Sequence, residues 1–149
     1  MPKKLLNEET DNQVRQLFDS ELVDPGELLV FLNDGNYETC EDVRQLLEEL
    51  TDTSDKLHFS TYDLERNTQL AQQYHVELTP GLVIAGREGD EVLDFGIRFN
   101  GIPAGYEFGS LIQDILHISK RNAGLHPETR EKLKCLKKLV QPKVFVTST

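Results

Sequence analysis

Apolar side chains along the chain recur at two spacings, one typical of helices and the other of strands. Val43, Leu46, Leu47 and Leu50 stand three and four residues apart, as they would on one face of a helix. Residues 28–32 (Leu-Leu-Val-Phe-Leu) instead form a short continuous apolar run, which is typical of a strand. Both patterns continue along most of the chain.

These patterns predict helices and strands in a definite order. Helices are expected over residues 10–20, from Cys40 to about residue 52, over 67–74, and from Gly105 or Tyr106 onward. Strands are expected over 28–32, 56–63, 82–84 and 92–99, and the short link 86–90 makes the last two a hairpin. This α/β order is that of the thioredoxin fold with one extra helix in front.

Two further elements are expected near the C-terminus. Pro127 suits the first residue of a helix, with Leu133, Leu136 and Leu139 along one side. Residues 143–146 then have the pattern of a strand, which we interpret as the start of another unit.

Composition and charge limit the classes of protein. Of the 149 residues, 38% are hydrophobic and 28% charged, as in a globular domain, and no apolar run approaches the ~20 residues that span a bilayer. The N-terminus lacks the apolar core of a signal peptide, and two cysteines cannot form a disulfide framework. We therefore expect a cytoplasmic protein that does not enter a membrane.

Charge is divided unevenly along the chain. Residues 1–119 carry 8 Lys and Arg against 24 Asp and Glu, whereas residues 120–149 carry 8 against 2. The acidic main body argues against nucleic-acid binding. A basic segment of this kind can bind an acidic partner, but such a helix more often lies against its own acidic domain, which is what we expect here.

The chemistry of the chain centres on a lone cysteine at the start of a helix. A dithiol oxidoreductase needs one thiol at the helix start and a second three residues later. Cys40 fits the second position, but the first is Tyr37. The four histidines lack metal-ligand spacing, residues 87–90 are expected to form a solvated loop, and no nucleotide-binding motif is present, so no metal or cofactor is expected.

Several segments together carry a resemblance to a known family. Residues 37–40 (Tyr-Glu-Thr-Cys), Thr79-Pro80, 94–99 (Asp-Phe-Gly-Ile-Arg-Phe) and 101–108 (Gly-Ile-Pro-Ala-Gly-Tyr-Glu-Phe) occur in order. With them, the chain resembles the N-terminal unit of the glutaredoxin-like protein disulfide oxidoreductases, cytoplasmic proteins with two thioredoxin-fold units in tandem. The resemblance implies a central mixed sheet of about four strands flanked by helices over residues 1–122. Residues 123–149 would be a linker helix and the first strand of a second unit.

A second family shares part of these features. The N-terminal region of the flavoprotein subunit of alkyl hydroperoxide reductase also has two thioredoxin folds, the first without its cysteine pair. Residues 101–108 fit both families, and the longer match favours the oxidoreductases.

The resemblance also implies roles for individual residues. In the family the first cysteine attacks the substrate disulfide, so Tyr37 in its place cannot perform exchange. Cys40 falls on the resolving position, where burial and the carboxylates of Glu38 and Glu41 should make it a weak nucleophile. Pro80 corresponds to the family's cis-proline, and Tyr37, Thr79 and Pro80 would line a groove that binds an extended substrate.

The sequence thus predicts the N-terminal unit of a protein disulfide oxidoreductase whose own cysteine site is degenerate. Its partners would be protein disulfide substrates or a second thioredoxin-fold unit, and this chain alone is expected to be inactive. Two alternatives stay open: a binding or scaffold module that performs no redox chemistry, and a monothiol enzyme that uses Cys40.

Overall fold

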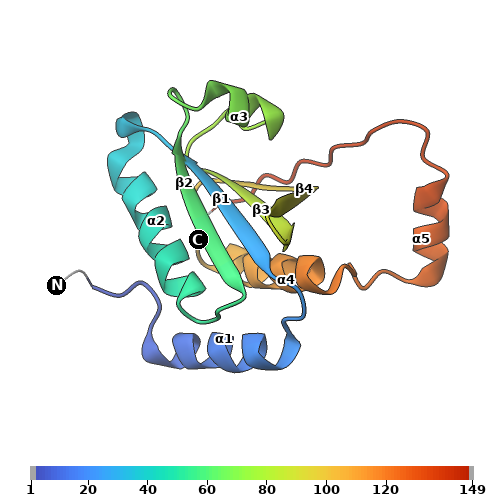
Figure 1. The fold of residues 1–149 in the computed structure, drawn as a ribbon, viewed down its shortest axis with the longest axis horizontal. Helices are drawn as coiled ribbons and strands as arrows, with labels where there is room; N and C mark the ends of the chain where they lie inside the picture. Colours follow the sequence, from blue (N-terminus) through green and yellow to red (C-terminus); the bar gives the residue numbers. More distant parts are fainter. Residues whose placement is uncertain (1–2, 148–149) are drawn as a thin grey trace.

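The fold is an α/β arrangement of four strands and five α-helices within the described residues 3–147 of a computed structural model (Figure 1). The elements in chain order are α1 (Glu8–Glu21), β1 (Gly26–Leu32), the 3-10 turn η1 (Asp34–Asn36), α2 (Tyr37–Thr51), β2 (Leu57–Asp63), α3 (Thr68–Gln73), β3 (Gly81–Glu88), β4 (Glu91–Asn100), α4 (Tyr106–Lys120) and α5 (Pro127–Lys134). No helix among these residues is long and apolar enough to cross a membrane.

The four strands form one mixed sheet in the order β2-β1-β3-β4. β1 pairs with β2 in parallel and with β3 in antiparallel, and β3 and β4 form the hairpin. Because β1 lies inside the sheet and is covered on both faces, almost all of its residues are buried. The mixed four-stranded sheet expected from the sequence is confirmed.

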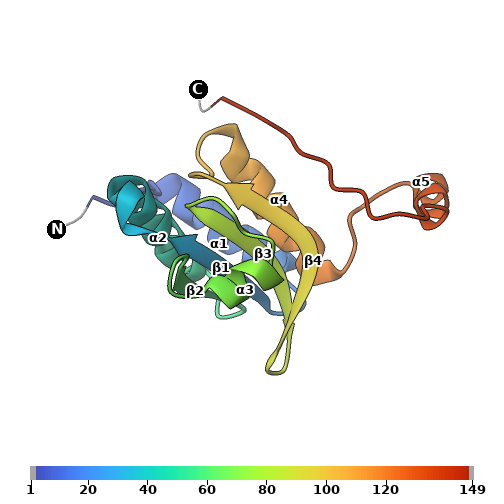
Figure 2. The same cartoon turned by 90° about the horizontal axis from the view of Figure 1, so that it is seen from above.

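Helices cover the two faces of the sheet unequally (Figures 1 and 2). α1, α2 and α4 pack on one face, where their apolar side chains meet those of β1 and β3 in the larger core. The short helix α3 covers part of the other face, where Ala71 and Tyr74 contact the smaller core around Phe31 and Val83. The extra N-terminal helix is thus part of the main core, through Val14 and Phe18.

A buried hydroxyl joins the end of α4 to the connection between α1 and β1. Ser119, on the last turn of α4, accepts hydrogen bonds from the backbone N–H groups of Val23 (2.8 Å) and Asp24 (3.1 Å). It donates to the carbonyl oxygen of Asp24 at 2.8 Å. These bonds fix the C-terminal end of α4 to the connection between α1 and β1.

The C-terminal expectations were partly wrong. α5 begins at Pro127 as predicted but ends at Lys134, so Leu136 and Leu139 lie beyond the helix. Residues 143–146 form no strand, because a strand needs a neighbour for its backbone groups and the four strands of the sheet pair only with one another. α5 also stands away from the acidic body, and none of its side chains is buried (Figure 1).

The expected loop at residues 87–90 was wrong as well. β3 continues to Glu88, so only residues 89 and 90 form the hairpin turn. Arg87 is half-buried and pairs with Glu27 of β1, whose side chain is 6% exposed. The charged residues around Gly89 are typical of a solvated loop, so the sequence did not predict this ion pair.

Candidate functional site

Three connections between elements meet at one end of the strands of the sheet. β1 ends at Leu32, and its neighbour β3 begins at Gly81, opposite Phe31. β4 ends at Asn100, opposite Gly81. The β1–α2 connection, the segment before β3 and the β4–α4 connection therefore lie together, and they contain the site residues expected from the sequence.

Cys40 lies in the first turn of α2 and faces the protein interior. The helix begins at Tyr37, so residue 37 has the first helical position and Cys40 the fourth. Cys40 is 4% exposed and its thiol is free. The side chain of Tyr37 lies outside what the structure describes. The second cysteine, Cys135, is also free but exposed, at the end of α5.

The charges around the start of α2 are mostly acidic. Glu38 is in the first turn, where a carboxylate suits the helix dipole. Arg44, the only basic residue of α2, is paired with Glu41 and, at 3.5 Å, with Glu48. The hydrogen bond from Arg44 lowers the pKa of Glu41 below its ordinary value. The guanidinium of Arg44 is thus paired with carboxylates of its own helix.

Thr79 and Pro80 lie directly before β3, next to the end of β1. The Thr79–Pro80 peptide bond is cis, which is the geometry that the resemblance implied. Pro80 is buried and Thr79 half-buried. The carbonyl oxygen of Pro80 accepts a hydrogen bond from the backbone N–H of Gly101 at 2.9 Å. Because Gly81 pairs with Phe31, the next-to-last residue of β1, Pro80 lies near the end of β1.

Gly81 allows the segment before β3 to turn tightly. A Cβ atom at this position would lie 2.5 Å from Cγ1 of Val76 and 2.6 Å from the carbonyl oxygen of Leu78. Only a residue without a side chain tolerates so close an approach. Sequence reasoning missed this role, although a Pro-Gly pair is itself a signal of a turn.

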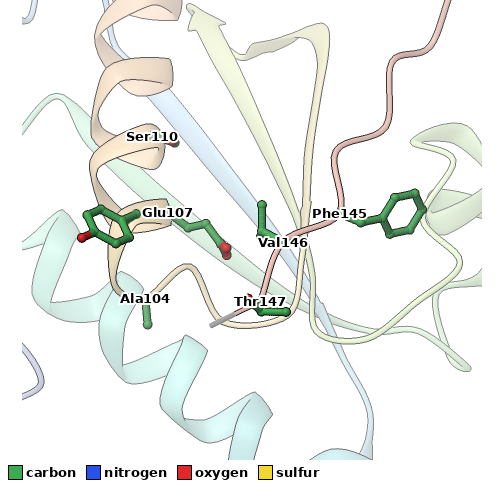
Figure 3. Close-up of a pocket in the computed structure, with 7 residues that line it drawn as sticks. Ala104, Glu107, Ser110, Phe145, Val146 and Thr147 are labelled. Carbon is green, nitrogen blue, oxygen red and sulfur yellow. The ribbon is translucent and has the colours of Figure 1, made fainter. Parts of the chain in front are cut away.

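A separate open pocket of about 590 Å³ lies at the start of α4 (Figure 3). Its walls come from α4 and its leading connection on one side and from residues 145–147 on the other. Glu107 points toward Val146 and Thr147, whereas the ring of Phe145 points away. Cys40, Thr79 and Pro80 do not line this pocket. Within residues 3–147, no three His, Cys, Asp or Glu side chains gather as a metal site.

Comparisons with known proteins give relatives of two kinds. A subunit of the alkyl hydroperoxide reductase of Staphylococcus aureus is 32% identical over 117 residues, which are 78% of this chain and 19% of the relative. The chain therefore spans about a fifth of the length of the curated relatives that it matches. No family model matches the chain.

Solved structures show the same two kinds of relative. A protein disulfide oxidoreductase from Aeropyrum pernix K1 is 30% identical, with a TM-score of 0.73 over 88% of this chain and 55% of that one. The N-terminal domain of the alkyl hydroperoxide reductase AhpF from Enterococcus faecalis has a TM-score of 0.77 at 23% identity, covering 89% and 62% of the two chains. The thioredoxin-like fold and both resemblances expected from the sequence are confirmed.

Proposed function

Because this chain is a thioredoxin-fold, disulfide oxidoreductase-like domain, we propose that it binds extended protein segments without exchanging disulfides itself. Disulfide exchange needs an accessible thiolate that can attack. Here the one cysteine at the start of α2 is 4% exposed, and this burial is the observation that carries the proposal. The chain alone is then inactive, and Cys40 is a remnant of a resolving cysteine.

The binding surface in this proposal is the groove beside Tyr37, Thr79 and Pro80. Thr79 is half-buried and lies two residues before the first residue of β3, next to the end of that strand. An extended segment can add to such a strand end through backbone hydrogen bonds. That mode of binding requires no thiol, which fits a unit with a degenerate cysteine site.

The organisation that we propose is a tandem protein. Residues 1–122 are the thioredoxin-like domain, and residues 123–149 lead into a second thioredoxin-fold unit, which is the main partner of this one. The exposed apolar side chains of the C-terminal segment, among them Leu139 (99%) and Phe145 (90%), support a partner that covers them. We place the protein in the cytoplasm, since its two cysteines are free.

An insulin reduction assay tests the redox part of the proposal. The wild-type chain should show no turnover with dithiothreitol as reductant, whereas a monothiol enzyme using Cys40 would show it. Tyr37→Cys should gain activity, because it restores a thiol at the first position of the helix, where the helix dipole favours the thiolate. Tyr37→Ser is the matched control. Activity in the wild type would overturn the proposal, and no gain in Tyr37→Cys would favour a pure binding module.

A second candidate is the N-terminal region of a peroxide-reductase flavoprotein. The 32% identity to the subunit of alkyl hydroperoxide reductase favours it. The mass and spectrum of the protein purified from its source cells separate the two. A product larger than 17.0 kDa without flavin absorbance would support the tandem oxidoreductase, and a larger product with flavin absorbance would support the flavoprotein. A natural product of 17.0 kDa would overturn both.

A further inference from the structure

The segment from Tyr74 to Pro80 joins α3 to β3 and carries the backbone of the proposed groove. Its last residue is held through the hydrogen bond between Pro80 and Gly101. Its middle is held by Val76, which is 8% exposed and whose N–H donates to the carbonyl oxygen of Ala71 at 2.8 Å. Its first residue, Tyr74, is buried in the smaller core, and its N–H donates to the carbonyl oxygen of Leu70 at 3.0 Å. The carbonyl oxygen of Tyr74 is bound from β4.

An irregularity in β4 prepares this contact. The pairing with β3 shifts between Asp94 and Ile97, so Phe95 and Gly96 are extra residues that form a bulge. Gly96 has a φ of 85°, in the region that favours glycine. Residues four apart in a regular strand lie about 13 Å from each other, and two apart about 7 Å. The bulge therefore brings Asp94 and Arg98 as close as residues two apart.

Arg98 uses this closeness to join Asp94 to Tyr74. Its two terminal nitrogens donate to the two carboxylate oxygens of Asp94, each at 2.8 Å. Its Nε donates to the carbonyl oxygen of Tyr74 at 2.8 Å, and the guanidinium carbon lies 5.8 Å from the centroid of the Tyr74 ring. The Arg98 side chain is only 15% exposed. The planar guanidinium fixes the directions of its hydrogen bonds, which a lysine ammonium does not.

We propose that Arg98, oriented by Asp94 across the β4 bulge, is a positioning residue that sets the segment carrying Thr79 and Pro80 for an extended protein substrate. The inference rests on the binding function proposed above. Arg98 does not touch the substrate in this scheme. It acts by fixing Tyr74, from which six residues lead to Pro80, whose far end is tied to Gly101.

The test compares Arg98→Gln with a matched control in the full chain. Arg15 on α1 also pairs with an aspartate four residues earlier, Asp11, and also donates to a backbone carbonyl, that of Asp52 at 2.9 Å. Arg15→Gln therefore removes the same kinds of contact at a place remote from the groove. The probe is fluorescein-labelled insulin B chain with carbamidomethylated cysteines, and its binding is measured by fluorescence anisotropy on folded protein.

Arg98→Gln should weaken probe binding about tenfold, on the scale of losing hydrogen bonds made by a charged group, while Arg15→Gln binds as the wild type does. Amide hydrogen exchange should accelerate at Val76 and Gly81 in Arg98→Gln only. Arg98→Lys, which keeps the charge but not the fork, should bind with intermediate affinity and serves if Arg98→Gln unfolds.

Three outcomes would contradict the proposal, and they can be told apart. Wild-type binding by a folded Arg98→Gln or Arg98→Lys would overturn the positioning role alone. An equal loss in Arg15→Gln would assign the effect to general stability and overturn it too. Absence of binding by the wild type would overturn the proposed binding function, and the positioning role with it.

Discussion

Arg87 of β3 donates a hydrogen bond from Nη1 to Oε2 of Glu27 on β1 at 3.0 Å, across two neighbouring strands. The other carboxylate oxygen of Glu27 accepts a hydrogen bond from the Ser60 hydroxyl of β2, also at 3.0 Å. One buried carboxylate thus connects three of the four strands. It lies toward the end of the strands that is opposite the candidate site. Within the described part of the chain, Arg87 is the one cation that pairs with it.

Removing that cation should destabilise the fold. Arg87→Ala leaves the Glu27 carboxylate buried, and the Ser60 hydroxyl is then its one partner among the described residues. We expect a loss of about 2 kcal/mol in the free energy of unfolding, measured by urea denaturation. Lys134→Ala is the control, since it breaks the exposed ion pair with Glu131 and should change stability by less than about 0.5 kcal/mol. Equal stability of Arg87→Ala and wild type would show that Glu27 tolerates burial without this partner.

Glycines at two positions should respond oppositely to alanine. Gly81→Ala places a Cβ against the carbonyl oxygen of Leu78, and because this neighbour is backbone, the segment must shift. We expect a loss of about 2 kcal/mol or more in the free energy of unfolding. Gly109→Ala in α4 meets nothing within 4 Å and should stabilise the helix by up to about 1 kcal/mol. Thermal unfolding of the two variants would check the signs, and a neutral Gly81→Ala would contradict the close approach.

The sequence was sufficient for most of the fold, and it also predicted which residues form the candidate site. Periodicity located the core helices and all four strands, because each has apolar side chains that are buried in a core or packed against one. The lone Cys40 was found from residue type and spacing, and the Thr79-Pro80 pair from the resemblance to a known family. Their positions follow from local order along the chain, which a sequence carries directly.

The rest depends on contacts between distant segments, which periodicity does not encode. Ser119 is a polar residue on a helix, and only the fold shows that its hydroxyl meets Asp24. Arg98 was seen as part of a motif, but its function as a link to Tyr74 requires the bulge and the packing of α3. The expected strand at residues 143–146 was wrong because a strand pattern states a preference and not the presence of a partner.

Acid should lower the stability of the fold by protonating Asp94. The hydrogen bond from Arg98 lowers the pKa of Asp94 below its ordinary value, so the folded state favours the carboxylate. The stabilisation is complete above the ordinary pKa of about 3.9 and is lost as the pH falls through the lowered folded-state value. Wild type should therefore exceed Asp94→Asn by up to about 1 kcal/mol at neutral pH, and the difference should disappear in strong acid.

Asp114 is the control for that experiment, because its contribution to stability should change with pH in the opposite direction. Burial raises the pKa of Asp114 on α4, so the folded state disfavours its charge. Stability is lost as the pH rises from the ordinary value through the raised one. Asp114→Asn should be at least as stable as wild type at neutral pH. Urea denaturation of both variants from acid to neutral pH would measure the two trends, and a pH-independent difference for Asp94→Asn would refute the linkage.

The two cysteines should differ sharply in reactivity toward a maleimide at neutral pH. Cys135 is exposed at the end of α5 and should be labelled at the rate of a free thiol, whereas the buried Cys40 should be labelled only when the domain opens. In Cys135→Ser the remaining thiol is Cys40, and its labelling should be at least a hundredfold slower than that of Cys135 in Cys40→Ser. Urea above the unfolding midpoint should make the two rates equal, which controls for the reagent. Fast labelling of folded Cys135→Ser would show an open Cys40 thiol and would bring back the monothiol enzyme as the better explanation.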